Sequence, residues 1–178
     1  MKNFEISVNL RDCENIDTFK SVVKEVRDRF IQLFGADVLD RLPLFVDNCT
    51  KDGGYTPTSY VVLDSFVLIK LKISDFTRRE QITYQCAHEM THFTYRCLIG
   101  LNKKTANVYE ESICSAMSLC FLYGNCANFN SWCEHVKGLK HEGYRKGYEV
   151  AEKVNFSPYK LRDKILAELS DYRKIASP

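Results

Sequence analysis

The segment YQCAHEMTHFTY, residues 84–95, places two of the chain's four histidines four positions apart, with a glutamate beside the first. On an α-helix each residue advances by about 100° and 1.5 Å, so His88 and His92 would share one face and both imidazoles could reach one ion. Glu89 would stand to the side, where a metal-bound water would lie. The HExxH spacing therefore suits zinc hydrolysis, in which two neutral nitrogens hold a Lewis acid and the adjacent carboxylate takes a proton from its water.

The rest of this helix is consistent with a site but does not require one. An 80° stripe of apolar residues should face the core, namely Ile82, Cys86, Met90, Phe93 and Cys97. The histidines share another side with Gln81, Gln85, Tyr95 and Ile99. That side could line a cleft covered by another element, or it could be an ordinary solvated polar face.

A third ligand would distinguish the two interpretations, because catalytic zinc sites use three protein ligands and leave one position for water. Glu110 and Glu111 lie 18 and 19 residues after His92, at the start of the next expected helix. Glu110 follows Asn107 by three positions, where a capping-box glutamate folds back on the helix start. Glu111 has small neighbours that would let its helix approach closely. We therefore expect Glu111 to be the ligand, with Glu110 as the alternative ligand and a metal-free surface pair as the remaining interpretation.

The pattern HEMTH, followed by a helical glutamate in ESICSAMSLCFL, resembles the gluzincin, or thermolysin-like, zinc metallopeptidases. The size of the chain resembles the small bacterial single-domain members. The resemblance implies that His88, His92 and Glu111 bind Zn²⁺ and that Glu89 is the general base. It also puts Ser115 where many members carry an Asp or Asn that supports a ligand histidine, so the usual outer carboxylate is unassigned.

In this family the strand before the zinc helix commonly borders the substrate cleft, and residues 66–73 hold that place. An exposed edge there could pair with an extended peptide. The alternative is an interior strand packed on both sides, because its FVLI run is apolar throughout.

Peptide hydrolysis also needs a donor for the oxyanion. The candidates for oxyanion or substrate contacts are His135, His141, Tyr144 and Tyr148. Tyr95 is expected to pack near the ligands, and Trp132 to build core.

The elements that must position these residues indicate one α+β domain over residues 1–178, with a mixed part at 1–73 and a helical part at 74–178 that carries the metal site. The zincin-like fold implied by the resemblance has a small sheet with a hairpin before the active-site helix. Strands are expected at 4–10, 44–46, 60–63 and 66–73, the last two forming the hairpin. Helices are expected at 16–34, from a Thr77–Glu80 capping box to Ile99, from Asn107 to Gly124, at 131–153 and at 158–175.

Composition limits the partners and the location. The 25 basic and 23 acidic residues nearly balance, so no global field favours nucleic acid or a membrane surface. The N-terminus lacks an apolar stretch of secretory length, and no apolar run is long enough for a membrane span. We expect a soluble cytoplasmic protein whose eight cysteines, without a CxxC pair, are free thiols, with disulfides or a cysteine metal site as alternatives.

The leading functional hypothesis is a zinc metallopeptidase that hydrolyses a peptide or protein substrate through a zinc-bound water activated by Glu89. The alternative is a non-catalytic or regulatory binding protein that retains a zincin fold. A third hypothesis treats HEMTH as accidental in a helical interaction protein.

Overall fold

The computed structural model describes residues 3–7, 13–49, 57–100 and 106–176, with side chains described as far as Leu169. Within these ranges, four strands form an N-terminal sheet and seven helices make up the rest, so the expected α+β architecture with a helical C-terminal half is confirmed. The strands are β1 (Phe4–Ile6), β2 (Leu44–Asn48), β3 (Thr58–Val62) and β4 (Phe66–Leu71). The helices are α1 (Ile16–Phe34), α2 (Ala36–Leu39), α3 (Arg79–Ile99), α4 (Val108–Leu122), α5 (Phe129–Lys137), α6 (Glu142–Lys153) and α7 (Pro158–Ala176).

The sheet has the order β1-β2-β4-β3, in which β1, β2 and β4 are parallel and β3 is antiparallel to β4. The predicted hairpin is confirmed. Its turn holds Leu63 and Asp64 at φ 52° and 50°, and the Ser65 hydroxyl donates to the Leu63 carbonyl at 2.7 Å. Of the two alternatives for residues 66–73, the interior strand is confirmed and the exposed edge is wrong, because β4 lies between β2 and β3. The hairpin's first strand, β3, is the edge strand instead.

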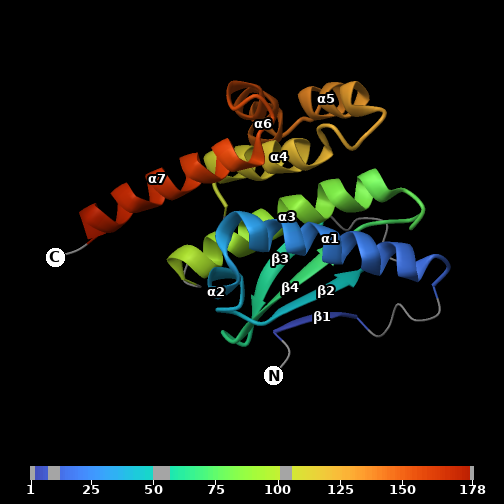
Figure 1. The fold of residues 1–178 in the computed structure, drawn as a ribbon, viewed down its shortest axis with the longest axis horizontal. Coiled ribbons are helices and arrows are strands. Elements are labelled where there is room, and N and C mark those ends of the chain that lie inside the picture. The colour runs from blue at the N-terminus through green and yellow to red at the C-terminus, as the bar shows by residue number, and fades with distance from the viewer. Residues whose placement is uncertain (1–2, 8–12, 50–56, 101–105, 177–178) are drawn as a thin grey trace.

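Helix α3 lies between the sheet and α4, beside α1, and α5 and α6 lie on the far side of α4 (Figure 1). Helix α7 contacts both α4 and α1. The predicted apolar stripe of α3 is confirmed, since all five of its residues are buried. The Thr77–Glu80 capping box is wrong. The helix begins at Arg79 without a side-chain cap, because the Thr77 hydroxyl donates to Asp75 Oδ1 at 2.6 Å.

Helix α4 runs through the centre of the helical part and is buried on nearly every side from Ser112 onward. Its predicted cap is half right. Asn107 Oδ1 accepts the backbone N–H of Glu110 at 2.8 Å, but the Glu110 carboxylate does not return to the helix start. It turns toward α3 instead.

The single helix expected at residues 131–153 is wrong, because two helices occupy this range. The Gly138 N–H closes α5 on the carbonyls of Glu134 and His135 at 3.0 and 3.1 Å, and α6 begins at Glu142. Helix α6 then packs against α4 through two glycines. A Cβ on Gly143 would lie 2.6 Å from Glu111 Cβ, and one on Gly147 would lie 2.3 Å from Ser115 Cβ. The two helix backbones are therefore in close contact beside Glu111.

Two expectations about cysteines and membranes can also be compared with the structure. All eight cysteines are free, as predicted, and six of them are buried. No helix among the described residues is long and apolar enough to cross a membrane.

Candidate metal centre

The two histidines of α3 do not lie on a solvated polar face. His88 and His92 are only 7% and 8% exposed, and their ring centroids are 5.1 Å apart. Gln81 and Gln85 line one neighbouring cavity, and Tyr95 and Ile99 line another. The side of α3 that carries the histidines therefore borders hollows in the molecule, as the first interpretation of the sequence predicted.

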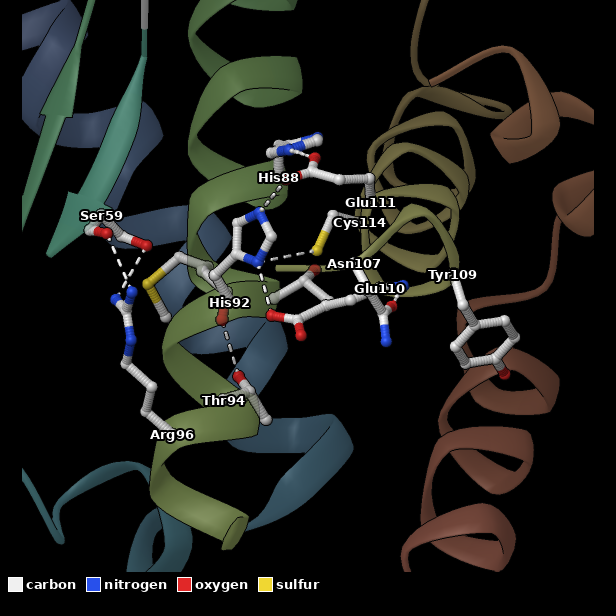
Figure 2. Close-up of polar contacts among 12 residues, drawn as sticks. Ser59, His88, His92, Thr94, Arg96, Asn107, Tyr109, Glu110, Glu111 and Cys114 are labelled. Atoms are coloured by element: carbon white, nitrogen blue, oxygen red, sulfur yellow. Dashed lines mark hydrogen bonds and ion pairs between the residues drawn. The ribbon is translucent and has the colours of Figure 1, made fainter. Parts of the chain in front are cut away.

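His88, His92 and Cys114 could hold a metal ion, because one ligand atom from each lies within 4.8 Å of the others and all three residues are buried. The chemistry of the set fits a metal of intermediate softness such as zinc, which binds imidazole and thiolate together. Cys114 was not expected as a ligand from the sequence. Its position on α4 is one turn after Glu110, facing His92 (Figure 2).

Both glutamates of α4 also reach the histidines. Glu111 Oε2 lies 3.1 Å from His88 Nε2, and its Oε1 lies 3.5 Å from His92 Nε2. Glu110 Oε1 lies 2.8 Å from His92 Nδ1. The structure thus brings together His88, His92 and Glu111, the ligands expected from the sequence, and adds Glu110 at the opposite nitrogen of His92 (Figure 2).

The two nitrogens of His92 therefore face different partners. Nε2 faces Glu111, whereas Nδ1 faces both Glu110 and, at 3.4 Å, Cys114 Sγ. An ionised carboxylate can only accept a hydrogen bond, so Glu110 requires a proton on Nδ1. With Nδ1 protonated, Nε2 is the nitrogen available to a metal in the neutral ring. A metal ion could therefore bind His92 in one of two ways: at Nε2 together with Glu111, or at Nδ1 together with Cys114.

The buried ionisable groups at the centre shift one another's pKa values. Burial lowers the pKa of His92, but Cys114, Glu110 and Glu111 outweigh it and hold that pKa well above its ordinary value. Burial acts to raise the pKa of Glu111, yet the hydrogen bonds from both histidines bring it below its usual range. For Cys114, burial raises the pKa to about 11, so its sulfur is a protonated thiol at neutral pH without a metal.

Glu89 lies near strand β3. It is buried, and this burial raises the pKa of its carboxyl group above the ordinary value. The Ser59 hydroxyl is close enough to share a hydrogen bond with Glu89. Arg96 in turn donates to Ser59, at 2.9 Å to Oγ and 2.9 Å to the carbonyl oxygen (Figure 2). Strand β3 is thereby fixed over the motif glutamate.

Two cavities open at the centre. One, of about 340 Å³, is lined by both histidines and by Glu89, Glu110 and Glu111. The other, of about 540 Å³, reaches His88 and Glu89 from the side of α5. Pro57 and Tyr144 line both cavities. The two cavities therefore adjoin each other and form a hollow region beside β3, α5 and α6.

The four candidates for oxyanion or substrate contacts lie at different distances from this hollow. Tyr144 is the one whose ring packs on a metal-centre histidine, edge-on to His88 with centroids 5.3 Å apart. His141 packs behind it at 4.8 Å, and His135 lines the larger cavity. Tyr148 lines neither described cavity and donates to Glu152 at 2.9 Å.

Ser115 does not support a histidine. It is fully buried, and its hydroxyl is near that of Tyr84. The carboxylate that contacts a histidine from this helix besides Glu111 is Glu110, at His92 Nδ1. Ser59 and Arg96 were also missed. Asn107-Val-Tyr-Glu110 carried a capping signal that hid the role of Glu110, and no local pattern links Ser59 to a helix 37 residues away.

Comparison with known proteins gives no relative for this chain: no family model matches it, and no curated protein or solved structure does. The centre is therefore interpreted through its own geometry.

Proposed function

We propose that the protein is a zinc-dependent metallopeptidase of gluzincin type, in which His88, His92 and Glu111 hold Zn²⁺ and Glu89 is the general base. The observation that carries this proposal is the convergence of both Nε2 atoms on the Glu111 carboxylate, at 3.1 and 3.5 Å. Ligand atoms held at about 2.0–2.1 Å by a tetrahedral zinc lie roughly 3.3 Å from one another. Each imidazole thus lies next to one oxygen of the Glu111 carboxylate, at separations compatible with ligands of one ion.

The charge of the site supports a bound cation. Glu89, Glu110 and Glu111 lie around two imidazoles, and the first two carboxylates are buried. Buried charges in proteins are paired or coordinate metals, because an unpaired buried charge is costly. A divalent cation between Glu111 and the imidazoles would offset this concentration of negative charge.

Glu111 is preferred over Cys114 as the third ligand for two reasons. Glu110 holds the proton on His92 Nδ1, which is the nitrogen nearest Cys114. The thiol, with its pKa raised to about 11, would have to lose its proton to bind, whereas Glu111 is already ionised.

Zinc bound here would supply a Lewis acid that polarises the scissile carbonyl and lowers the pKa of the attacking water. The chain's own groups would do the rest. Glu89 would accept the proton of the attacking water and pass it to the leaving amine. Ser59, held by Arg96, would orient the Glu89 carboxylate. Tyr144, at the junction of the two cavities, would donate its hydroxyl proton in a hydrogen bond to the developing oxyanion.

The substrate would be a peptide or protein segment in extended form. Strand β3 is a sheet edge, and Thr58 and Ser59 line the smaller cavity together with Glu89 and both histidines. A peptide could add to this edge by backbone hydrogen bonds and bring one carbonyl to the metal.

Three matched variants test the proposal with zinc binding and hydrolysis of a mixed peptide library as separate measurements. Glu89→Gln should retain zinc and lose hydrolysis. Glu111→Gln should lose tight zinc binding, and Cys114→Ser should keep both. Zinc binding that survives in Glu111→Gln but not in Cys114→Ser would overturn the ligand assignment. Retained zinc with no hydrolysis by the wild type would favour a non-catalytic binding protein.

A further inference from the structure

The larger cavity has a feature that peptide hydrolysis by itself does not use: its wall is rich in aromatic rings. Tyr84 of α3 and Trp132 of α5 stack with centroids 4.9 Å apart and planes 21° apart, and both line the cavity. Tyr144 closes the end nearest the metal centre, with Pro57 and Leu139 as further apolar lining. This volume of about 540 Å³ lies within the range of ligand pockets, about 300–1,000 Å³.

The position of Trp132 differs in part from the sequence expectation. Trp132 was predicted to build core, and it does pack against the core, but it is only partly buried and also lines the cavity. His135 packs edge-on against the same indole at 5.8 Å. The indole is thus held between two rings of the protein while it lines an open space.

The polar groups of the wall are mostly neutral. Gln81, Gln85, Asn128 and Ser131 contribute amides and a hydroxyl, and Gln81 Oε1 has no hydrogen-bond partner among the described residues. Away from Glu89, the charged lining residue among the described residues is the exposed Arg78. It lies ten residues before His88, about 15 Å along the helix. An acidic substrate side chain that entered the cavity near the metal centre would lose its hydration and lie far from Arg78, the residue that could pair with it.

We propose that this cavity is a specificity pocket for a planar aromatic side chain, Phe, Tyr or Trp, next to the scissile bond of the substrate. This pocket would add substrate specificity to the proposed peptidase, and the position of the scissile bond rests on that proposed function. Aromatic rings prefer offset-stacked or edge-to-face contacts at about 4.5–7 Å between centroids. The Tyr84–Trp132 pair and the Tyr144 ring offer both kinds of contact to a guest ring, which an aliphatic side chain of similar area cannot use.

Trp132 is the sole tryptophan of the chain, so its fluorescence reports occupation of the pocket without any hydrolysis. We would titrate zinc-loaded Glu89→Gln protein with the capped pentapeptides Ala-Ala-Phe-Ala-Ala, Ala-Ala-Leu-Ala-Ala and Ala-Ala-Glu-Ala-Ala. The phenylalanine peptide should change the emission saturably. The leucine peptide should bind roughly 3- to 10-fold more weakly, the affinity equivalent of an aromatic pair, and the glutamate peptide more weakly still.

A matched pair of substitutions on α5 locates the binding. Ser131 lines the pocket and the neighbouring Asn130 does not, while both are exposed. Ser131→Phe should fill the pocket and abolish the phenylalanine preference, and Asn130→Phe should preserve it. Equal affinity for the phenylalanine and leucine peptides, tighter binding of the glutamate peptide, or an unchanged preference in Ser131→Phe would each overturn the proposal.

Failure of the proposed function gives a different result. Saturable, phenylalanine-selective binding without hydrolysis by the zinc-loaded wild type would refute the peptidase and leave an aromatic-peptide binding site. Hydrolysis with no preference for any of the three peptides would refute the pocket and leave the peptidase.

Discussion

Glu110 has two roles that its side chain and its backbone perform separately. Its N–H is capped by Asn107, while its carboxylate accepts from His92 Nδ1 at 2.8 Å. A carboxylate at the second nitrogen of a ligand histidine fixes the tautomer and makes the ring a better donor to the metal. The capping signal in the sequence was therefore correct for the backbone and misleading for the side chain.

Glu110→Gln should weaken zinc binding by about 10- to 100-fold, because the neutral amide still accepts from Nδ1 but no longer strengthens the imidazole as a ligand. The helix start should be unaffected, since its cap uses the backbone. Competition with a chromophoric chelator measures the affinity. Glu134→Gln, at an exposed glutamate of α5, is the control and should bind zinc as the wild type does. An unchanged affinity in Glu110→Gln would refute its role.

Sequence spacing predicted the histidine pair because four positions on a helix determine a shared face wherever the helix is placed. The same reasoning could not assign the glutamates. Whether Glu110 or Glu111 reaches a given nitrogen depends on how α4 is rotated against α3, and that rotation is set by packing of residues far apart in the chain. Cys114 illustrates this. In the sequence it resembles an ordinary small apolar residue, and only the packing of α4 against α3 places its sulfur next to His92.

Among the secondary-structure elements, strand β3 is tied to helix α3 most visibly by the side chain of Arg96. Arg96 makes two hydrogen bonds to Ser59, one to its hydroxyl and one to its carbonyl. Each bond involves a charged donor in a partly buried setting, where such bonds contribute more than at the surface. The edge strand and Glu89 are therefore kept in register by an interaction that no sequence pattern indicates.

Arg96→Met should lower the free energy of unfolding by about 2–3 kcal/mol. The substitution removes two charge-assisted hydrogen bonds and leaves the hydroxyl and carbonyl oxygens of Ser59 without this donor. Ser59→Ala should cost only about 1 kcal/mol, since the carbonyl bond remains. Urea unfolding measures both. Arg79→Met is the control, because Arg79 pairs with Glu25 on the surface at 3.0 Å and should change stability by less than about 1 kcal/mol. Equal losses of unfolding free energy in the Arg96 and Arg79 variants would show that the Arg96–Ser59 hydrogen bonds do not stabilise the fold.

The contact between α4 and α6 gives a second prediction about elements. Gly143→Ala would put a Cβ 2.6 Å from Glu111 Cβ, whereas Gly147→Ala would put one 2.3 Å from Ser115 Cβ. Overpacking should destabilise both variants by about 1–3 kcal/mol. The higher helix propensity of alanine should offset up to about 1 kcal/mol of this loss. Only Gly143→Ala should also weaken zinc binding, because it displaces Glu111.

Gly147→Ala is thus the matched control for Gly143→Ala, and thermal unfolding with a zinc titration separates stability from affinity. Combining Gly147→Ala with Ser115→Gly should restore part of the lost stability, since the clashing Cβ is removed. A Gly143→Ala protein that binds zinc as tightly as Gly147→Ala would show that the position of Glu111 does not depend on this contact.

The elements themselves were predictable where their signals are local. The α1 helix and the hairpin follow from periodicity and turn residues. The break between α5 and α6 was missed because residues 131–153 contain three glycines, and only Gly138 lies at the break. Gly143 and Gly147 lie inside α6, so glycine alone does not locate the end of a helix here. The apolar FVLI run indicated an interior strand as one alternative, but the sequence did not name its neighbours. The pairing of β4 with β2 joins segments about twenty residues apart.

At the scale of the whole molecule, the metal centre joins two layers. His88 and His92 belong to the helix that lies next to the sheet, and Glu110, Glu111 and Cys114 belong to the helix at the centre of the helical part (Figure 1). Without a cation, the carboxylates that face the histidines weaken this junction unless the imidazoles are protonated. A bound ion would therefore stabilise the packing of α3 against α4, and with it the whole fold.

Zinc should raise the thermal midpoint of the wild type. A ligand present at about 100 times its Kd stabilises the folded state by about 2.7 kcal/mol, which corresponds to a shift of roughly 5–11 °C for a domain of this size. Differential scanning calorimetry of chelator-treated protein, with and without added zinc, measures the shift. Mg²⁺, which prefers oxygen ligands in octahedral geometry, should give little change. Glu111→Gln should lose most of the zinc shift, because its carboxylate is the link from α4 to the ion, whereas Cys114→Ser should retain it. A wild type whose midpoint is the same with and without zinc would mean that the ion does not contribute to the packing of α3 against α4.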